Sequence, residues 1–345
     1  MKHITKITLV ILTSFAFTLS AFAGDLQVTG AAKASYKIGG ADKNNSKGLG
    51  VSNELDFSAT GELDNGYTWS WQTQLDDAGT VNDDTKLTVT TPMGMLGVYI
   101  TEGGMSKELG YGIGAMGPGS DWAGPMTIVW GYDVSSYNNV QYSLPSGMLP
   151  YGITAGIGYV PNLSDAQGAS FKAEGSVETA AVGSDAIMYN LTAAPVDGLS
   201  IGAAYFNASP TTGSRYDQES GDVYFKYVMG PVSVGAAKSA AVPYSAKGTE
   251  AIFYETDSYG LQFAVNDQLS LSYSKEASEK STRVGVVDGA TVGTKTSVES
   301  KITHIQAAYT IGGATLGFAV ADASDSDYTA GVDEKVSTFT IAMAF

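Results

Sequence analysis

Along most of the chain, apolar and polar residues alternate one by one. From Leu26 to Ile38 the even positions are mainly apolar and the odd positions mainly polar, and segments 67–72, 222–227 and 259–265 repeat the pattern. Because successive side chains of a β-strand point to opposite faces, this alternation predicts strands with one apolar and one polar face. A single strand of this kind also suits a soluble β-sandwich, so the number and order of the strands must decide.

Short and long connections alternate strictly between these strands. The short ones contain the Gly, Pro, Asn or Asp that tight turns need, and they are residues 64–66, 92–94, 145–149, 195–198, 229–231, 266–268 and 311–313. The long ones are more polar and begin near Gly39, Asp77, Glu102, Val160, Ala208, Ala240, Ala277 and Ala323. Seven short and eight long connections predict 16 strands. We therefore predict an all-β chain: a 16-stranded antiparallel transmembrane β-barrel with short periplasmic turns and long extracellular loops.

Tyrosines give an independent check of this arrangement. If the first strand starts on the periplasmic side, one group lies near the short turns, namely Tyr67, Tyr151, Tyr227 and Tyr309. A second group lies near the long loops, namely Tyr36, Tyr159, Tyr189, Tyr205 and Tyr273. Two such girdles are typical of a membrane barrel, whereas the general preference of Tyr for strands explains only its abundance.

The first 23 residues are expected to be a secretory signal peptide. Lys2 and Lys6 precede the apolar stretch Ile7–Leu19, and Ala21-Phe22-Ala23 supplies the small residues of a cleavage site. The apolar stretch is too short to span a bilayer comfortably, which disfavours the alternative of a membrane anchor. The barrel would then comprise residues 24–345, with His304 as its only histidine.

Composition narrows the classes of protein further. The chain has 345 residues, no Cys and a formal net charge of -16. The missing cysteines exclude disulfides and thiolate zinc sites, and the negative charge argues against nucleic acid as a partner. The mean hydropathy is +0.00. This value is the average expected of a chain that combines an apolar outer face, a polar inner face and acidic loops.

Three segments resemble a known family. They are the opening Asp25-Leu26-Gln27-Val28-Thr29-Gly30, the arm Tyr67-Thr68-Trp69-Ser70 after Asp64-Asn65-Gly66, and the last strand, Val336–Phe345, with its terminal Phe345. The chain resembles the Gram-negative general-diffusion porins, in particular the alphaproteobacterial type. The resemblance implies a homotrimer in the bacterial outer membrane, in contact with its lipids, and passive diffusion of small hydrophilic solutes. It also implies a third loop folded into the pore and Phe345 as a signal to the outer-membrane assembly machinery.

The third long loop, about residues 102–133, is the candidate functional element. It is rich in Gly but also contains Trp122, Ile128 and Trp130, which favours packing over disorder. The resemblance implies that its charges line a constriction, and they are Glu102, Lys107, Glu108, Asp121 and Asp133. Basic residues would face them from the barrel wall, where the polar strand faces offer Lys33, Lys37 and Lys86. The chain departs from the family in having only two Arg, Arg215 and Arg283, both in or beside later long loops.

Acidic residues are also expected along the pore wall. Glu54, Asp56, Glu62 and Asp76 fall on polar strand faces. Rings of carboxylates favour cations, so we predict a mild cation preference.

Other motifs carry less weight. Gly112-Ile113-Gly114-Ala115-Met116-Gly117 matches a dinucleotide-binding pattern, but Pro118-Gly119 follows where that site needs a helix. No cofactor is expected apart from Ca²⁺ at acidic loops, with Asp322, Asp325 and Asp327, or Asp76, Asp77, Asp83 and Asp84, as candidate ligands. Solvated loop tips are the simpler interpretation of both groups.

Two other functions compete with a general-diffusion channel. A substrate-specific channel for sugars would need aromatic residues on the lumen face, but most aromatic residues here are expected on the outward face. A channel for anions would need rings of Arg and Lys, which are scarce. An enzyme would need a nucleophile beside a histidine, and His304 stands alone in the sequence. We therefore expect no enzymatic activity.

Overall fold

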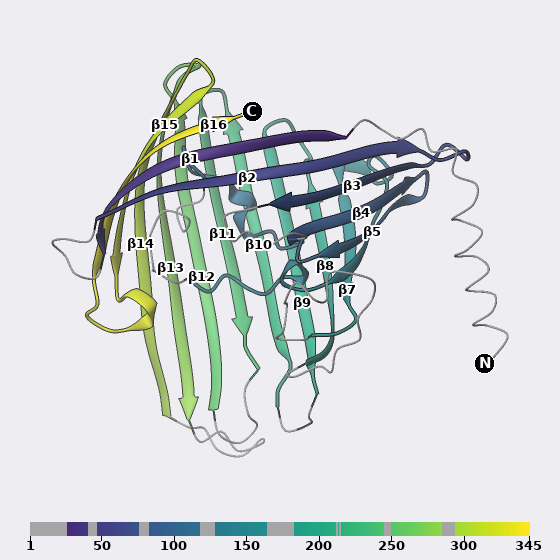
Figure 1. Cartoon of the computed structure of the whole chain (residues 1–345). Coiled ribbons are helices and arrows are strands. Elements are labelled where there is room, and N and C mark those ends of the chain that lie inside the picture. Colours follow the sequence, from purple (N-terminus) through teal and green to yellow (C-terminus); the bar gives the residue numbers. More distant parts are fainter. Residues whose placement is uncertain are drawn as a thin grey trace.

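The computed structural model describes residues 26–40, 47–75, 83–117, 128–163, 183–211, 213, 215–244, 250–284 and 294–345. Within these residues, 16 strands form one closed antiparallel barrel in which β1 pairs with β16 (Figure 1). The strands are β1 (Gln27–Gly40), β2 (Lys47–Glu62), β3 (Thr68–Leu75), β4 (Asp83–Thr91), β5 (Gly94–Ile100), β6 (Asn139–Ser143), β7 (Thr154–Val160), β8 (Gly183–Ala193), β9 (Leu199–Pro210), β10 (Gln218–Met229), β11 (Val232–Val242), β12 (Glu250–Ala264), β13 (Leu269–Val284), β14 (Thr294–Ile311), β15 (Ala314–Ser324) and β16 (Glu334–Ala344). The predicted fold class is thus confirmed.

Each predicted short turn joins two neighbouring strands, and we call that side of the barrel the short-turn end and the opposite side the long-loop end. One long connection was predicted wrongly. The loop expected near Ala277 begins only after Val284, because β13 continues to pair with β14 as far as Val284 and Thr294. The stretch from Ala277 carries charged and small polar side chains, so it lacks the apolar alternation by which the other strands were recognised.

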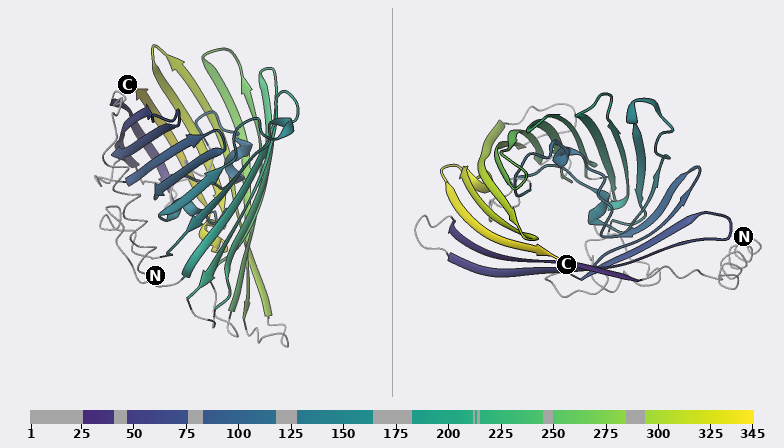
Figure 2. Two further views of the ribbon diagram at one scale, coloured as in Figure 1. Left: turned by 90° about the vertical axis from the view of Figure 1, so that its right-hand side faces the viewer. Right: turned by 90° about the horizontal axis from the view of Figure 1, so that it is seen from above.

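The two sides of the barrel differ in strand length. Strands β12 to β14 have 15, 16 and 18 residues, whereas β5 and β6 have only 7 and 5. Figure 1 shows β10 to β14 running steeply, while β1 and β2 cross the barrel at a lower angle. The described parts of the third loop, residues 101–117 and 128–138, leave from the short side and, seen from above, lie within the ring of strands (Figure 2).

The alternation predicted from the sequence separates an outer from an inner face. On β16 the outward Phe339 and Ile341 are exposed, whereas Thr338 and Thr340, which alternate with them, are buried. No helix in the described part of the chain is long and apolar enough to cross a membrane.

The buried apolar residues lie between the third loop and the inner wall. One cluster joins Met105 and Val134 of the loop to Met188 and Phe206 of β8 and β9. A second joins Tyr111 and Ile113 to Ala237, and a third joins Ile128 to Ile302, Ala321, Ala323 and Val336. A barrel of this width has no core of its own, so the loop supplies one.

Candidate functional site

The outgoing arm of the third loop, residues 101–117, crosses the inner wall on a series of hydrogen bonds. The backbone N–H of Lys107 donates to Oδ1 of Asp222 on β10 at 2.8 Å. Further along, the N–H of Ala115 donates to Ser272 on β13, and that of Met116 donates to Gln306 on β14, at 2.8 and 2.9 Å. These wall groups satisfy backbone donors that the irregular loop cannot pair internally.

The returning arm, residues 128–138, follows the same wall nearer the long-loop end. Thr256 of β12 donates to the carbonyl of Val129 at 2.7 Å, and the N–H of Val129 donates to the hydroxyl of Tyr328 at 2.9 Å. The N–H of Tyr132 donates to Ser220 at 2.9 Å. Both arms are therefore fixed to the wall, and the loop narrows the lumen on one side.

Wall glycines make room for the outgoing arm. A Cβ added at Gly235 would lie 2.6 Å from the carbonyl oxygen of Tyr111, and one at Gly260 would lie 2.5 Å from Cγ2 of Ile113. Such distances are far inside van der Waals contact, so only glycine allows this close approach. Two further wall glycines lie under flexible side chains of the loop, Gly158 under Met105 and Gly317 under Met116.

The carboxylate of Asp133 ties the two arms together at the base of the loop. It accepts hydrogen bonds from the N–H groups of Met105, Ser106 and Ser135 at 2.8, 2.5 and 2.8 Å. The carboxylate that we expected to line the pore thus also holds the loop in shape.

Glu108 also departs from the expected pore-lining position. It lies in the short helix η1 (Glu108–Tyr111), and only 8% of it is exposed. Burial raises the pKa of Glu108 above its usual range, and the nearby charge of Asp133 adds to this effect. Desolvation disfavours the charged form of a carboxyl group, so Glu108 does not present an open charge to the pore.

A buried polar group lies beneath the loop. Glu276 of β13 and His304 of β14 are 0% and 1% exposed, with Oε2 and Nε2 3.8 Å apart. The hydroxyl of Tyr111 donates to Oε1 of Glu276 at 3.0 Å. The only histidine of the expected mature chain is therefore shut off from the lumen.

The remaining expected lumen residues lie on the inner face of the early strands. Lys33 and Lys37 share a face with Ser35 on β1, and register places Glu54 opposite Ala31 on that same face. Asp56 accepts hydrogen bonds from Gln72 and Gln74 at 3.1 and 3.3 Å.

Two expected constriction residues meet directly. Lys86 of β4 and Glu102 at the start of the third loop form an ion pair of 3.1 Å. Glu62 lies on the inner face of β2 near the short-turn end, paired with Thr68. Asp76 and Asp121 lie outside the described residues.

Sequence reasoning missed two features of the lumen. Lys226 on β10 donates to the carbonyl of Gly112 at 3.3 Å, and it belongs to the polar face of an alternating strand. Aromatic residues were expected mostly outside, yet Tyr254 packs on Tyr328 with ring centroids 5.3 Å apart, and Lys280 lies 6.0 Å from the Tyr254 ring. Only the tertiary fold brings these rings together, because Tyr254 lies on β12 and Tyr328 lies in the connection between β15 and β16.

The three candidate calcium ligands do not converge. Asp322 forms an ion pair of 2.9 Å with Lys335, and Asp325 accepts a hydrogen bond from the N–H of Gly331 at 2.6 Å. Among the described residues, no group of three or more His, Cys, Asp or Glu side chains is placed to hold a metal ion.

Phe345 closes the barrel at its backbone. Its N–H donates to the carbonyl of Gly30 at 2.9 Å, and its carbonyl accepts from the N–H of Gly30 at 2.8 Å. The side chain is 70% exposed.

Comparison with known proteins relates this chain to bacterial porins. No protein-family model and no curated protein matches it. The anion-selective porin from Comamonas acidovorans superposes with a TM-score of 0.67 at 14% identity, covering 93% of this chain and 100% of that one. Salmonella typhi OmpF, in complex with daunomycin, gives 0.61 at 15% identity over 93% and 98%. A mutant of the Rh. blastica porin gives 0.57 at 13% identity over 93% and 100%. The chain therefore has the fold of these porins.

Proposed function

We propose that this protein is a porin, a water-filled channel for passive diffusion of small hydrophilic solutes and ions. The observation that carries the proposal is the third loop, which is bound along the inner wall of a closed barrel and narrows the lumen on one side. A fixed constriction in a barrel with an apolar outer face suits a size-limited channel. The fold shared with bacterial porins supports it. We infer no enzymatic activity, since His304 lies buried beneath the loop.

The channel is proposed to prefer cations only slightly. The chain is acidic overall, and Glu54, Asp56 and Glu62 lie on the inner face. Lys33 and Lys37 share that face, and the buried Glu108 adds no open charge. Opposite charges in the same lumen offset each other, so the preference should be small.

A sugar-specific channel is the second candidate. Tyr254, Tyr328 and Lys280 form an aromatic and basic group on the inner wall near the returning arm. Aromatic rings bind the apolar faces of sugar rings. This group of residues is therefore the observation that favours a sugar-specific channel.

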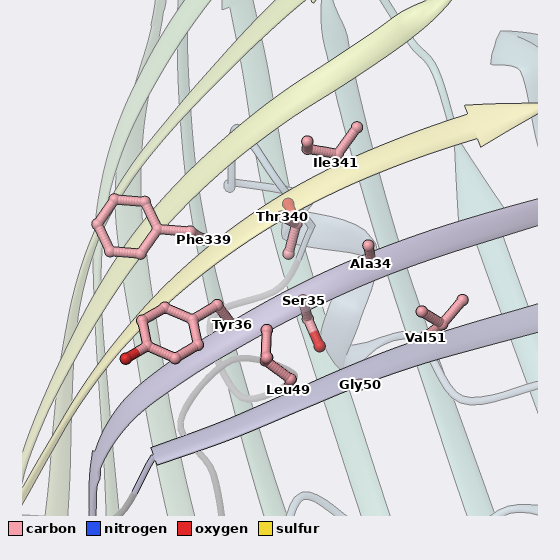
Figure 3. Close-up of a pocket in the computed structure, with 9 residues that line it drawn as sticks. All are labelled: Ala34, Ser35, Tyr36, Leu49, Gly50, Val51, Phe339, Thr340 and Ile341. Atoms are coloured by element: carbon pink, nitrogen blue, oxygen red, sulfur yellow. The ribbon is translucent and has the colours of Figure 1, made fainter.

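A homotrimer is proposed, with an outer groove as part of the contact. The groove has a volume of about 520 Å³ and lies on the outward side of β1, β2 and β16 (Figure 3). Leu49 and Val51, which line it, are 86% and 71% exposed, and the small residue Ala34 also lines it. Within lipid, small residues let two chains approach closely. Because the chain has no Cys, a bulky maleimide attached to a Val51→Cys variant would test this contact by its effect on trimer formation.

The outer membrane is the proposed location. The signal peptide expected at residues 1–23 would direct export, and Phe345 on the last strand would be read by the assembly machinery. Barrels of this plan are found in bacterial outer membranes.

Liposome swelling with sugars of increasing size tests the proposed function. Folded protein should admit the smallest sugars and progressively exclude larger ones, whereas heat-unfolded protein in the same liposomes should admit none. Folded protein that gave no swelling with any sugar would contradict a channel. Fast entry of one sugar, with slow entry of others of equal size, would favour the specific channel instead.

A further inference from the structure

Three side chains connect the third loop to the interior of the barrel wall. The hydroxyl of Tyr111 donates to Oε1 of Glu276 at 3.0 Å, and Oε2 of Glu276 lies 3.8 Å from Nε2 of His304. Tyr111, Glu276 and His304 are 1%, 0% and 1% exposed. The three groups are therefore shut off from lumen water, where the outgoing arm crosses β13 and β14.

The polar atoms between Glu276 and His304 lack other partners. Among the described residues, Oε2 of Glu276 and both ring nitrogens of His304 have no hydrogen-bond partner. The inner-face residues that strand register places beside this pair are uncharged: Ser258 and Ile302 next to Glu276, and Ser274 and Ala321 next to His304. Within this part of the chain, His304 is the group placed to balance the charge of the carboxylate.

The other charged groups near the outgoing arm are held by different contacts. Asp133 binds backbone N–H groups at the base of the loop, and its charge acts on Glu108. On β10, Asp222 accepts a backbone N–H of the loop and Lys226 donates to the carbonyl of Gly112. The Tyr111, Glu276 and His304 chain is thus a separate unit.

A charged Glu276 beside a neutral His304 would bury one net negative charge. An uncompensated buried charge costs more than one hydrogen bond returns. The anchored arm therefore favours the state in which the pair holds one additional proton, on Nε2 of His304 and directed at Oε2 of Glu276. Histidine is the side chain that ordinarily changes charge between about pH 5 and 8.

We propose that this buried proton holds the outgoing arm against the wall, with His304 as the positioning residue and Glu276 and Tyr111 as its connection to the loop. The anchored state binds more protons, so anchoring is complete at low pH and is lost as the pH rises. Once the proton leaves, water entering beneath Tyr111 relieves the buried charge, and the arm moves into the lumen. The channel is then narrower. The proposal deepens the proposed function and rests on it for its effect on conduction.

Thiol labelling of the folded protein in detergent reports the position of the arm without a conduction assay. The chain has no Cys, so Ile113→Cys places a single thiol at a position on the arm that is 1% exposed. Leu109→Cys places one on the same arm where 41% is exposed. The labelling ratio is the rate for Ile113→Cys divided by that for Leu109→Cys at the same pH, which removes the pH dependence of thiol chemistry. The ratio should rise about tenfold between about pH 5 and about pH 9.

Two variants, each combined with these thiols, separate the proton from the contact. Glu276→Gln keeps an acceptor for Tyr111 but removes the buried charge, so its labelling ratio should stay low and change by less than about twofold. His304→Gln leaves the carboxylate without its cation, so its ratio should already be high near pH 7. Glu108→Gln is the matched control. It removes another buried carboxyl group from the same arm, and the rise of about tenfold should persist.

Three results would overturn the proposal: a labelling ratio that did not change with pH, an equal rise in Glu276→Gln, or loss of the rise in Glu108→Gln. The mobility shift on unheated gels verifies that each variant folds. If His304→Gln does not fold, the double variant Glu276→Gln with His304→Gln replaces it, and its ratio should stay low at both pH values. A barrel that showed the rise but did not conduct would contradict the proposed function alone. A conducting barrel with a constant ratio would contradict this proposal alone.

Discussion

The hydroxyl of Tyr111 on the third loop donates a hydrogen bond of 3.0 Å to Oε1 of Glu276, whose side chain is fully buried on β13. These residues are 165 positions apart in the chain. This hydrogen bond joins the third loop to the barrel wall, and it supplies the buried carboxylate of Glu276 with a hydrogen-bond donor. The fixed position of the loop follows from contacts of this kind.

Tyr111→Phe should loosen the third loop. The change leaves the buried carboxylate of Glu276 with one hydrogen bond fewer, at a cost of about 1–3 kcal/mol in the free energy of unfolding. We expect a lower urea midpoint and noisier single-channel current. Tyr151→Phe is the control, because Tyr151 is 69% exposed and should behave as wild type. Equal midpoints for Tyr111→Phe and wild type would show that this hydrogen bond contributes nothing.

Gly235→Ala should push the outgoing arm into the lumen. The new Cβ would lie 2.6 Å from the backbone carbonyl of Tyr111, so the loop must move. We expect a lower single-channel conductance. Gly221→Ala on β10 is the matched control, since its Cβ would make only ordinary contacts of 3.7 Å or more. If both variants had the same conductance, the close contact between Gly235 and Tyr111 would not fix the position of the loop.

Neutralising the inner-face lysines should increase cation preference. Lys33→Gln with Lys37→Gln removes two positive charges from the lumen face of β1. The reversal potential in a salt gradient should therefore shift in the cation direction. Glu54→Gln with Asp56→Asn should shift it in the opposite direction. If neither pair moved the reversal potential, these side chains would not control selectivity.

Glu108→Gln should stabilise the protein at neutral pH. Burial raises the pKa of Glu108 in the folded protein, so the folded state holds its proton more tightly than the unfolded state does. Stability from this group is therefore greatest at low pH and is lost as the pH rises through the folded pKa. The urea midpoint of Glu108→Gln should exceed that of wild type at pH 8, and the two should converge near pH 3.

The exposed Glu62 supplies the control for that measurement. Glu62→Gln removes a carboxylate that the fold leaves in water, so its midpoint should follow wild type at both pH values. A gain for Glu108→Gln that persisted unchanged at pH 3 would arise from something other than protonation.

The sequence by itself determined the strands, their number and their order. Alternation of side chains is a local property, and so are the turn residues, which is why 266–268 and 311–313 could be recognised as turns. Local pattern also singled out the third loop. It failed at Ala277, where β13 continues without an apolar face and is held by pairing with β14.

Only the tertiary structure decided what the charged residues do. Asp133 and Glu108 look like pore carboxylates in the sequence, but one binds backbone N–H groups and the other is buried. The alignment of Glu255, Glu279 and Glu299 depends on the register between three strands. Register and the path of the loop arise from contacts between residues far apart in the chain, and no local pattern of residues specifies them.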